Sequence, residues 1–237
     1  ISLVSRTTKT ITLGFTMSDA HSGLATPTCK YSTTNGSYTT ACASVNTTTA
    51  TITGGTAGTT YYYQVCVADL VGNTATCKTG NTATGTTSTA VNFTKTPTSE
   101  QNGYLRTEVA NVTFGSNNVT TPTYYVKTDT AGVTSIAATA CGNSTDPGTC
   151  NGTQVAANGT LSAGYWYKVA GNVNITFSGT TLESTGTIYA KVNDGAIYSS
   201  SATGTRSKID ATPTVVSDIS LVSRTTKTIT LGYTMND

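Results

Sequence analysis

The sequence has few charged side chains, and this scarcity excludes several functions. Charged residues make up 10% of the 237 residues, against about 25% in an average soluble protein. The net charge is +2 and no run of basic residues is present, so the electrostatic attraction that drives nucleic-acid binding is missing. No apolar stretch approaches the ~20 residues of a membrane-spanning helix. We expect no nucleic-acid partner and no membrane span in this segment.

Residues that favour helices or catalysis are also scarce. The chain has two methionines, one histidine (His21) and three glutamates (Glu100, Glu108 and Glu183). The glutamates are too scattered to suggest the carboxylate pair of a glycosidase. A lone histidine in a Ser- and Asp-containing turn is more often solvated than catalytic. We therefore expect that the chain is not an enzyme and has no catalytic residue, no cofactor and no metal.

Threonine is what the sequence has in excess, at roughly a quarter of all residues, far above ordinary usage. Branching at Cβ restricts χ1 and favours an extended backbone. This composition predicts an all-β protein built from short strands.

The first nineteen residues return at the end of the chain. Residues 1–19 read ISLVSRTTKTITLGFTMSD, and residues 219–237 read ISLVSRTTKTITLGYTMND. The copies differ only where Phe15 stands against Tyr233 and Ser18 against Asn236. A match of this length predicts a tandem repeat with a period of 218 residues. We expect one full unit followed by the opening of the next, within a longer protein.

The six cysteines fall into three close pairs, which are Cys29 with Cys42, Cys66 with Cys77, and Cys141 with Cys150. Zinc sites usually have shorter Cys spacings or several histidine partners, and the chain has neither. Three local disulfides are therefore predicted. Disulfides indicate an oxidising compartment, outside the cell or at its surface.

A tight turn is predicted at Asn35-Gly36, a dipeptide that favours a two-residue type I′ hairpin loop. Cys29 and Cys42 are equidistant from this dipeptide, so they should face each other across the hairpin. Counting outward from the turn predicts a non-hydrogen-bonded pair, in which the side chains come closest. The middle of the Cys66–Cys77 stretch also falls in a predicted turn.

Residues 59–69 alternate in the manner of a half-buried strand, with Tyr61, Tyr63, Val65 and Val67 on the inner face. The last hairpin of fibronectin type III and bacterial immunoglobulin-like domains resembles residues 58–74, which read GTTYYYQVCVADLVGNT. The turn after their second strand resembles residues 18–32, SDAHSGLATPTCKYS. The resemblance implies tandem immunoglobulin-like (fibronectin type III-like) β-sandwiches of a bacterial or archaeal cell-surface protein. About seven strands at regular spacing predict the same sandwich.

Three parts are expected along the chain: a sandwich over 1–88, a larger sandwich over 89–212, and the start of the next repeat over 213–237. The second part should contain one long strand over 165–178, whose sequence YWYKVAGNVNITFS is similar to bacterial immunoglobulin-like repeats, and a tight hairpin at Asn193-Asp194-Gly195. Its length predicts an insertion or an extra strand pair. A linker is expected at 82–89 and a stiff joint at 207–214, where Pro213 restricts the backbone.

Other residue groups were weighed as sites. Asp19 and Asp69 both follow strands and would share a Ca²⁺ only with further oxygen ligands. Turn capping is the simpler interpretation. Trp166, between two tyrosines, suits a sugar-stacking platform but is more often a core residue. Lysines in or beside strands, which in some bacterial surface domains form bonds to Asn, are interpreted as surface side chains; these are Lys9, Lys127, Lys168 and Lys191.

Nine Asn-x-Ser/Thr motifs are candidate glycosylation acceptors, used only if the source has the machinery. They are Asn35, Asn46, Asn92, Asn111, Asn118, Asn143, Asn151, Asn158 and Asn174.

These features favour a structural repeat unit of a long extracellular fibre, stalk or surface layer, acting in assembly, spacing or adhesion. The expected partners are neighbouring repeats or copies of the same chain. Two alternatives remain open: a glycan- or host-protein-binding adhesin module, and a spacer of a surface enzyme.

Overall fold

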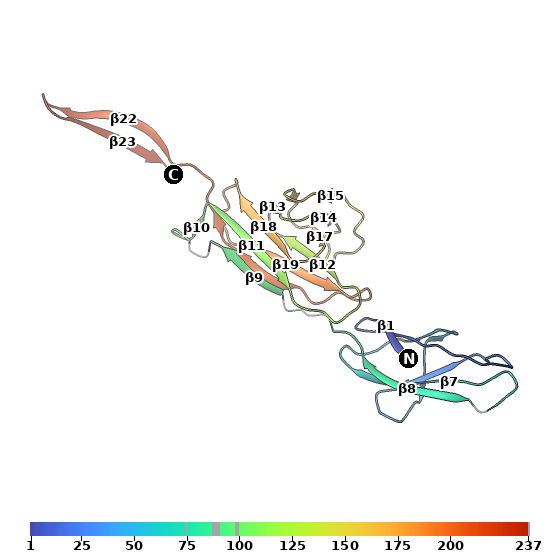
Figure 1. Ribbon diagram of the computed structural model, residues 1–237. Helices are drawn as coiled ribbons and strands as arrows, with labels where there is room; N and C mark the ends of the chain where they lie inside the picture. The colour runs from blue at the N-terminus through green and yellow to red at the C-terminus, as the bar shows by residue number, and fades with distance from the viewer. Residues whose placement is uncertain (74, 87–90, 98–99, 237) are drawn as a thin grey trace.

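The chain is all-β, as its composition predicts. The structure is a computed structural model that describes residues 1–73, 75–86, 91–97 and 100–236. Every regular element in these ranges is a strand, and none of the described residues forms a helix long and apolar enough to cross a bilayer. Two sandwiches and a separate hairpin follow one another along the chain (Figure 1).

The first sandwich has two four-stranded sheets. One sheet has the order β1 (Ser2–Arg6), β2 (Ile11–Gly14), β6 (Thr49–Ile52) and β5 (Ser44–Val45). The other has the order β4 (Thr40–Ala41), β3 (Thr28–Ser32), β7 (Thr60–Val67) and β8 (Thr76–Ala83). This strand order is that of an immunoglobulin-like sandwich. A tyrosine at the start of β7 closes back on the preceding loop, because the Thr56 N–H donates to the Tyr61 hydroxyl at 3.0 Å, a feature typical of the fold.

The core of this sandwich lies between the two sheets. Ile11 and Leu13 of β2 meet Tyr61 and Tyr63 of β7, and all four side chains are buried. The inner face of β7 is therefore the one that its alternation predicts.

The hairpin at Asn35-Gly36 differs from the predicted one. A type I′ turn needs positive φ at both central residues, whereas Gly36 has φ 81° and Asn35 is not among the residues with positive φ. The strands end at Ser32 and Thr40, so the loop is longer than two residues. The Ser37 N–H donates to the Thr34 carbonyl at 3.3 Å. This bond closes a four-residue turn with Asn35-Gly36 at its centre, so a tight turn does form there, but without the type I′ geometry.

The second sandwich extends the same plan. One sheet has the order β16 (Thr160–Leu161), β13 (Gly132–Thr134), β18 (Val173–Ser178), β11 (Thr107–Phe114) and β9 (Val91–Thr96). The other has the order β15 (Gln154–Val155), β14 (Ala138–Ala140), β17 (Trp166–Val169), β12 (Thr123–Thr128), β19 (Gly186–Asn193) and β20 (Ala202–Arg206). The strands between β12 and β18 lengthen both sheets at one edge. Val126, Ile175 and Ile188 are among the buried residues of its core.

The prediction of a single strand over 165–178 is wrong. The structure divides it into β17 and β18, which belong to different sheets. Both parts of the stretch are buried, since Tyr167 and Val169 are buried in β17 and Val173 and Ile175 are buried in β18. Apolar residues alternate through both strands, so the pattern conceals the crossing at 170–172.

The stiff joint expected over 207–214 is partly wrong, because half of it belongs to the second sandwich. β21 (Lys208–Ile209) pairs in parallel with β10 (Tyr104–Leu105), and Ile209 is buried. The Asp210 N–H donates to the Leu105 carbonyl at 2.8 Å. The connection to the last hairpin is therefore shorter than the sequence suggested.

The linker expected at 82–89 also starts later than predicted. β8 runs to Ala83, and Thr84 is buried with its hydroxyl donating to the Thr56 carbonyl at 2.5 Å. The rest of the linker beyond Thr86, and the expected boundary between 88 and 89, lie outside the described residues.

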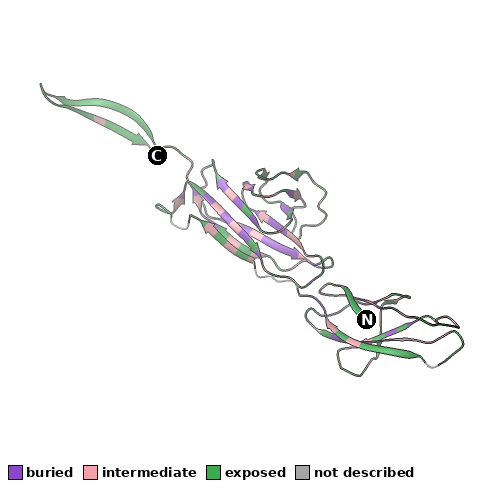
Figure 2. Ribbon diagram, viewed as in Figure 1, coloured by how far each residue is buried: buried purple, intermediate pink, exposed green. Residues whose placement is uncertain are grey.

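The last hairpin consists of β22 (Val215–Arg224) and β23 (Ile229–Asn236), which pair with no other strand in the part of the chain that the structure describes. Its residues are almost all exposed, whereas the centre of the second sandwich is buried (Figure 2).

Candidate functional site

The repeated sequence folds into the same hairpin in both places. In the first copy Ser2 pairs with Gly14 and Leu3 with Leu13, and in the second copy Ser220 pairs with Gly232 and Leu221 with Leu231. Each copy also has a register shift at the same point, between Leu3 and Ser5 and between Leu221 and Ser223. The register and its bulge are therefore set within the hairpin itself.

The tip of the hairpin is also the same in both copies. In the first copy the Thr7 hydroxyl oxygen accepts the N–H groups of Lys9 at 3.0 Å and Thr10 at 2.9 Å. In the second copy Thr225 accepts the N–H groups of Lys227 at 3.2 Å and Thr228 at 3.0 Å. The second tip makes these bonds while fully exposed, so its shape does not depend on a neighbouring domain.

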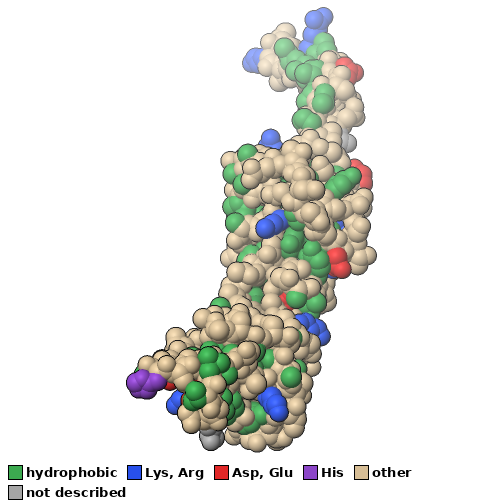
Figure 3. Space-filling view, turned by 90° about the vertical axis from the view of Figure 1, so that its right-hand side faces the viewer, with side chains coloured by type: hydrophobic (Ala, Val, Ile, Leu, Met, Phe, Trp, Pro, Cys, Tyr) green, Lys and Arg blue, Asp and Glu red, His purple; other side chains and the backbone are tan. Residues whose placement is uncertain are grey.

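The surroundings of the two copies differ completely. Leu13 is 0% exposed under the opposite sheet, whereas the equivalent Leu231 is 57% exposed. The same contrast holds for Ile11 and Ile229. Apolar side chains accordingly lie on the surface of the hairpin at the far end of the chain (Figure 3). Exposed apolar faces of this kind are typical of interaction surfaces.

The first hairpin tip is bonded to the second sandwich through Thr8. Both the N–H of Thr8, at 2.6 Å, and its hydroxyl donate to Oδ2 of Asp194. The other carboxylate oxygen, Oδ1, accepts the N–H groups of Ala196 and Ile197, both at 2.8 Å. Thr8 and Asp194 are 2% and 1% exposed. Asp194 thus closes its own turn with one oxygen and holds the first sandwich with the other.

The electrostatics of Asp194 suit this role. Burial alone raises the pKa of its carboxyl, but the hydrogen bonds from Thr8, Ile197 and Ala196 outweigh burial and place the pKa below its ordinary value. The carboxylate is therefore charged at neutral pH, and hydrogen bonds to a charged acceptor are stronger than neutral ones.

A second set of bonds surrounds Arg6. Its N–H donates to the Thr120 hydroxyl at 2.8 Å, and its carbonyl accepts the Thr120 N–H at 3.0 Å. Its Nε donates to the Asn118 carbonyl at 2.5 Å, and Asn118 Oδ1 accepts the Thr86 N–H at 2.5 Å. The joint between the sandwiches therefore includes the hairpin tip, the segment after β8 and the loop after β11.

Close packing at Gly85 completes the joint. The Gly85 N–H donates to the Thr7 carbonyl at 2.7 Å, and a Cβ on Gly85 would lie 2.5 Å from Cγ1 of the buried Val119. A larger residue at this position would require Val119 to shift.

Sequence reasoning did not identify the residues of this joint. Thr8 and Asp194 are 186 positions apart, and both resemble ordinary surface residues. The predicted turn at Asn193-Asp194-Gly195 does occur, since Gly195 has φ 94° and its N–H donates to Asn193 Oδ1 at 2.6 Å. The sequence therefore predicted the turn that contains Asp194, but it did not predict that Thr8 would contact this residue.

The structure contains three disulfides, Cys29–Cys42, Cys66–Cys77 and Cys141–Cys150, with the pairing that the spacing predicts. The expected geometry of the first is wrong. The Cys42 N–H donates to the Cys29 carbonyl at 3.0 Å and the Cα atoms are 5.4 Å apart, so this is a hydrogen-bonded pair. The short Cα separation expected there occurs instead at Cys66–Cys77, at 4.1 Å. Three disulfides in an immunoglobulin-like fold are typical of extracellular domains.

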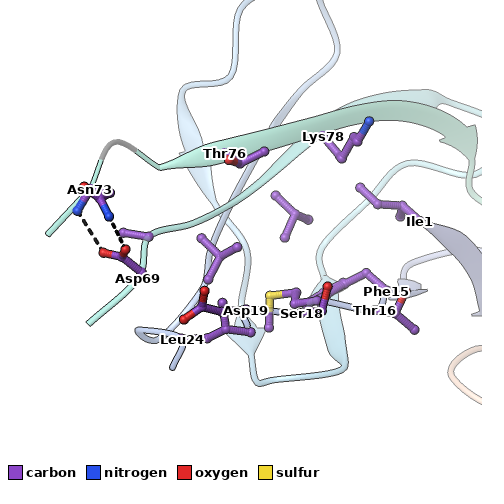
Figure 4. A pocket seen from close by; sticks show the side chains of 14 residues that line it. Ile1, Phe15, Thr16, Ser18, Asp19, Leu24, Asp69, Asn73, Thr76 and Lys78 are labelled. Atoms are coloured by element: carbon purple, nitrogen blue, oxygen red, sulfur yellow. Dashed lines mark hydrogen bonds between the residues drawn. The ribbon is translucent and has the colours of Figure 1, made fainter. Parts of the chain in front are cut away.

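Asp19 and Asp69 lie on the rim of one pocket at the end of the first sandwich (Figure 4). The hydrogen bond from the Ser22 hydroxyl lowers the pKa of Asp19, and the hydrogen bond from the Asn73 N–H lowers that of Asp69. Each carboxylate thus caps its own turn. Among the described residues, no group of three or more His, Cys, Asp or Glu side chains is placed to hold a metal.

Trp166 is a core residue, since it is buried and its Nε1–H donates to the Ser144 carbonyl at 3.0 Å. Lys191 was interpreted as a surface lysine, and this was wrong. Its side chain is buried, pairs with Asp146, and lies 5.7 Å from the centre of the Trp166 ring.

The candidate glycosylation motifs lie mostly on the surface. Asn111 is half-buried and the other eight asparagines are exposed. Asn118 is bonded within the joint, and Asn46 Oδ1 accepts the N–H groups of Thr48 at 2.8 Å and Thr49 at 2.7 Å. A glycan on Asn118 would therefore lie against the joint.

No family model matches the chain, and no curated protein matches it in sequence. Solved structures that match include chitinase ChiA74 from Bacillus thuringiensis, at 15% identity and a TM-score of 0.28, covering 76% of this chain and 26% of the chitinase. They also include the FN1–FN3 domains of chicken CNTN1, at 10% identity and a TM-score of 0.29, covering 98% of this chain and 74% of that one. The chain therefore spans about a quarter of the chitinase's length. Neither likeness is close enough to indicate a function, and the immunoglobulin-like fold is identified by the strand order itself.

Proposed function

We propose that the chain is a structural repeat unit of a long extracellular fibre, stalk or surface layer, and that its work is to hold a fixed spacing. The repeated hairpin carries this proposal. It has the same register and the same tip in both copies, but only the first copy has a core over it. The second copy is in this view the opening of another sandwich.

The bonded joint supports a role in spacing. Thr8, Arg6 and Gly85 fix the end of the first sandwich against the second through hydrogen bonds and close packing. A joint of this kind defines an angle between domains, and in an array a fixed angle sets the overall shape. The scarcity of charge removes electrostatic repulsion between neighbouring units.

The exposed face of the second hairpin supports a particular kind of partner in this proposal. Ile229, Leu231 and Tyr233 occupy the places of the buried Ile11, Leu13 and Phe15. In the first copy the opposite sheet covers them, with Tyr61, Tyr63 and Val65 of β7 in the same core. A neighbouring repeat or another copy of the chain supplies the same surface, and the unit itself carries no catalytic activity.

Electron microscopy of the native material tests the proposal. We expect filaments or a lattice with an axial repeat that contains both sandwiches. Isolated particles without axial order would refute the structural role. Binding of one isolated unit on a glycan array would instead favour the adhesin alternative, and a catalytic domain next to the repeats would favour a spacer in a surface enzyme.

A further inference from the structure

The first sandwich has a pocket of about 400 Å³ at the end of β2 remote from the joint. The buried Phe15 and Val65 line it together with Ile1 and Met17, and Figure 4 shows Ile1 and Phe15 beside it. The pocket is open at the edge of the sheet, where β1 starts, and polar side chains that include Thr16 and Lys78 line the rest of it.

The second copy of the hairpin shows what can continue β1 at this edge. β1 starts at Ser2, but β22 starts at Val215, five residues ahead of the equivalent Ser220. β2 ends at Gly14, whereas β23 continues through the equivalent Gly232 to Asn236. Both strands of the hairpin are therefore longer where residues 215–218 precede the repeat.

The register of the second copy places one valine over the pocket. Val216 pairs with Met235, and Ile219 pairs with Tyr233. Residues directly opposite each other in an antiparallel pair lie on the same face. Met235 and Tyr233 are equivalent to Met17 and Phe15, which line the pocket. Val215, paired with Asn236, faces the other way.

We propose that this pocket is the seat of a strand with the sequence of residues 214–218, Thr-Val-Val-Ser-Asp, joined directly ahead of Ile1. The strand extends β1 and pairs with residues 15–18 of the extended β2. The valine equivalent to Val216 enters the pocket between Ile1 and Met17, and the valine equivalent to Val215 faces solvent. This inference depends on the proposed function in one respect, namely that a preceding repeat supplies the segment ahead of Ile1.

The physical reason is the same as for any strand addition to an open sheet edge. Backbone hydrogen bonds to residues 16–18 give the alignment, and one inward side chain gives the selectivity. In the second copy Val216 is exposed, and β22 pairs with β23 alone among the strands that the structure describes. In the first sandwich the opposite sheet, with Val65 and Val67, is already in place.

The test adds the sequence of residues 213–218, Pro-Thr-Val-Val-Ser-Asp, ahead of Ile1 in the full chain. Two matched controls carry Val216→Ser or Val215→Ser in the added segment alone. The chain has two methionines, Met17 and Met235, so a spectrum of ¹³C-methyl-labelled methionine has two signals. Trp166 lies in the second sandwich, so its fluorescence checks that this domain is unchanged.

We expect the extension to shift the Met17 methyl signal, to leave that of Met235 in place, and to slow hydrogen exchange at residues 16–18. The thermal midpoint of the first sandwich should rise by roughly 4–8 °C. The Val216→Ser segment should lose most of this effect, and the Val215→Ser segment should keep it.

Equal effects of the two serine segments, or no effect of the extension, would overturn the proposal. A Met17 shift caused by Ca²⁺ alone, with none from the extension, would overturn it too and assign the pocket to a cation. This test is independent of the electron microscopy that tests the proposed function. A chain without an axial repeat can still accept the added strand, and an array can exist with this pocket empty.

Discussion

The joint between the sandwiches offers a sharp prediction, because the chain contains its own control. Thr8→Val keeps the shape of the side chain and removes the hydroxyl that donates to Asp194. Thr226→Val makes the same change at the equivalent position of the second tip, which is exposed. Any intrinsic effect of valine on the hairpin tip appears in both variants.

The expected loss follows from the geometry. The hydroxyl is one of four donors to the Asp194 carboxylate, which remains buried and charged when that donor is removed. A hydrogen bond to a charged group contributes about 1.5–3 kcal/mol. If this stabilises docking of the two sandwiches, the undocked population rises between ~10- and ~100-fold.

Rotational tumbling measured by NMR relaxation of backbone amides detects the change. Docked sandwiches tumble as one body, so both should give the same correlation time in the parent chain and in Thr226→Val. Thr8→Val should give shorter and unequal times for the two domains. Equal times in all three proteins would refute the view that the Thr8–Asp194 contact holds the joint.

Three other outcomes follow. The joint should hold at neutral pH and loosen below about pH 4. The pKa of the Asp194 carboxyl is lower in the docked protein than in the unfolded chain, so the charged carboxylate stabilises docking fully at a pH above the unfolded-state pKa. This stabilisation is lost as the pH falls through the pKa of the folded state. The same relaxation measurement from pH 7 to pH 3 checks this. Gly85→Ala should destabilise docking by about 1–3 kcal/mol through its clash with Val119, which small-angle scattering should register as a broader distribution of domain separations. Leu13→Ala should destabilise the first sandwich by about 2–5 kcal/mol in chemical denaturation, whereas Leu231→Ala should change little, because the first leucine is buried and the second is not.

Features set by neighbours along the chain were predictable. The alternation in β7 placed Tyr61, Tyr63 and Val65 on the inner face, because side chains in a strand alternate with a period of two. The two copies of the repeated sequence form the same hairpin, because its register depends on contacts within it. The cysteine pairs followed from their short separations.

Features set by distant contacts were not predictable. The alternation over 165–178 continues across two strands because both sheets bury the same residue types, so nothing marked the crossing between them. Ile209 joined the core through a pairing with β10, about a hundred residues earlier. The contact of Thr8 with Asp194 consists of polar residues without periodicity, and only the fold brings them together.

The position of the disulfides has a mechanical consequence. Each bridge closes a short stretch within one sandwich, with separations of 13, 11 and 9 residues, and none crosses the joint. A chain pulled from its two ends would unravel everywhere except inside these loops. At about 3.5 Å per residue, and less the 5.4 Å between the two Cα atoms, the Cys29–Cys42 loop alone withholds roughly 40 Å of length. Under tension the oxidised protein would therefore stretch less than the reduced one, and the redox state of its surroundings would set how far it extends before it breaks.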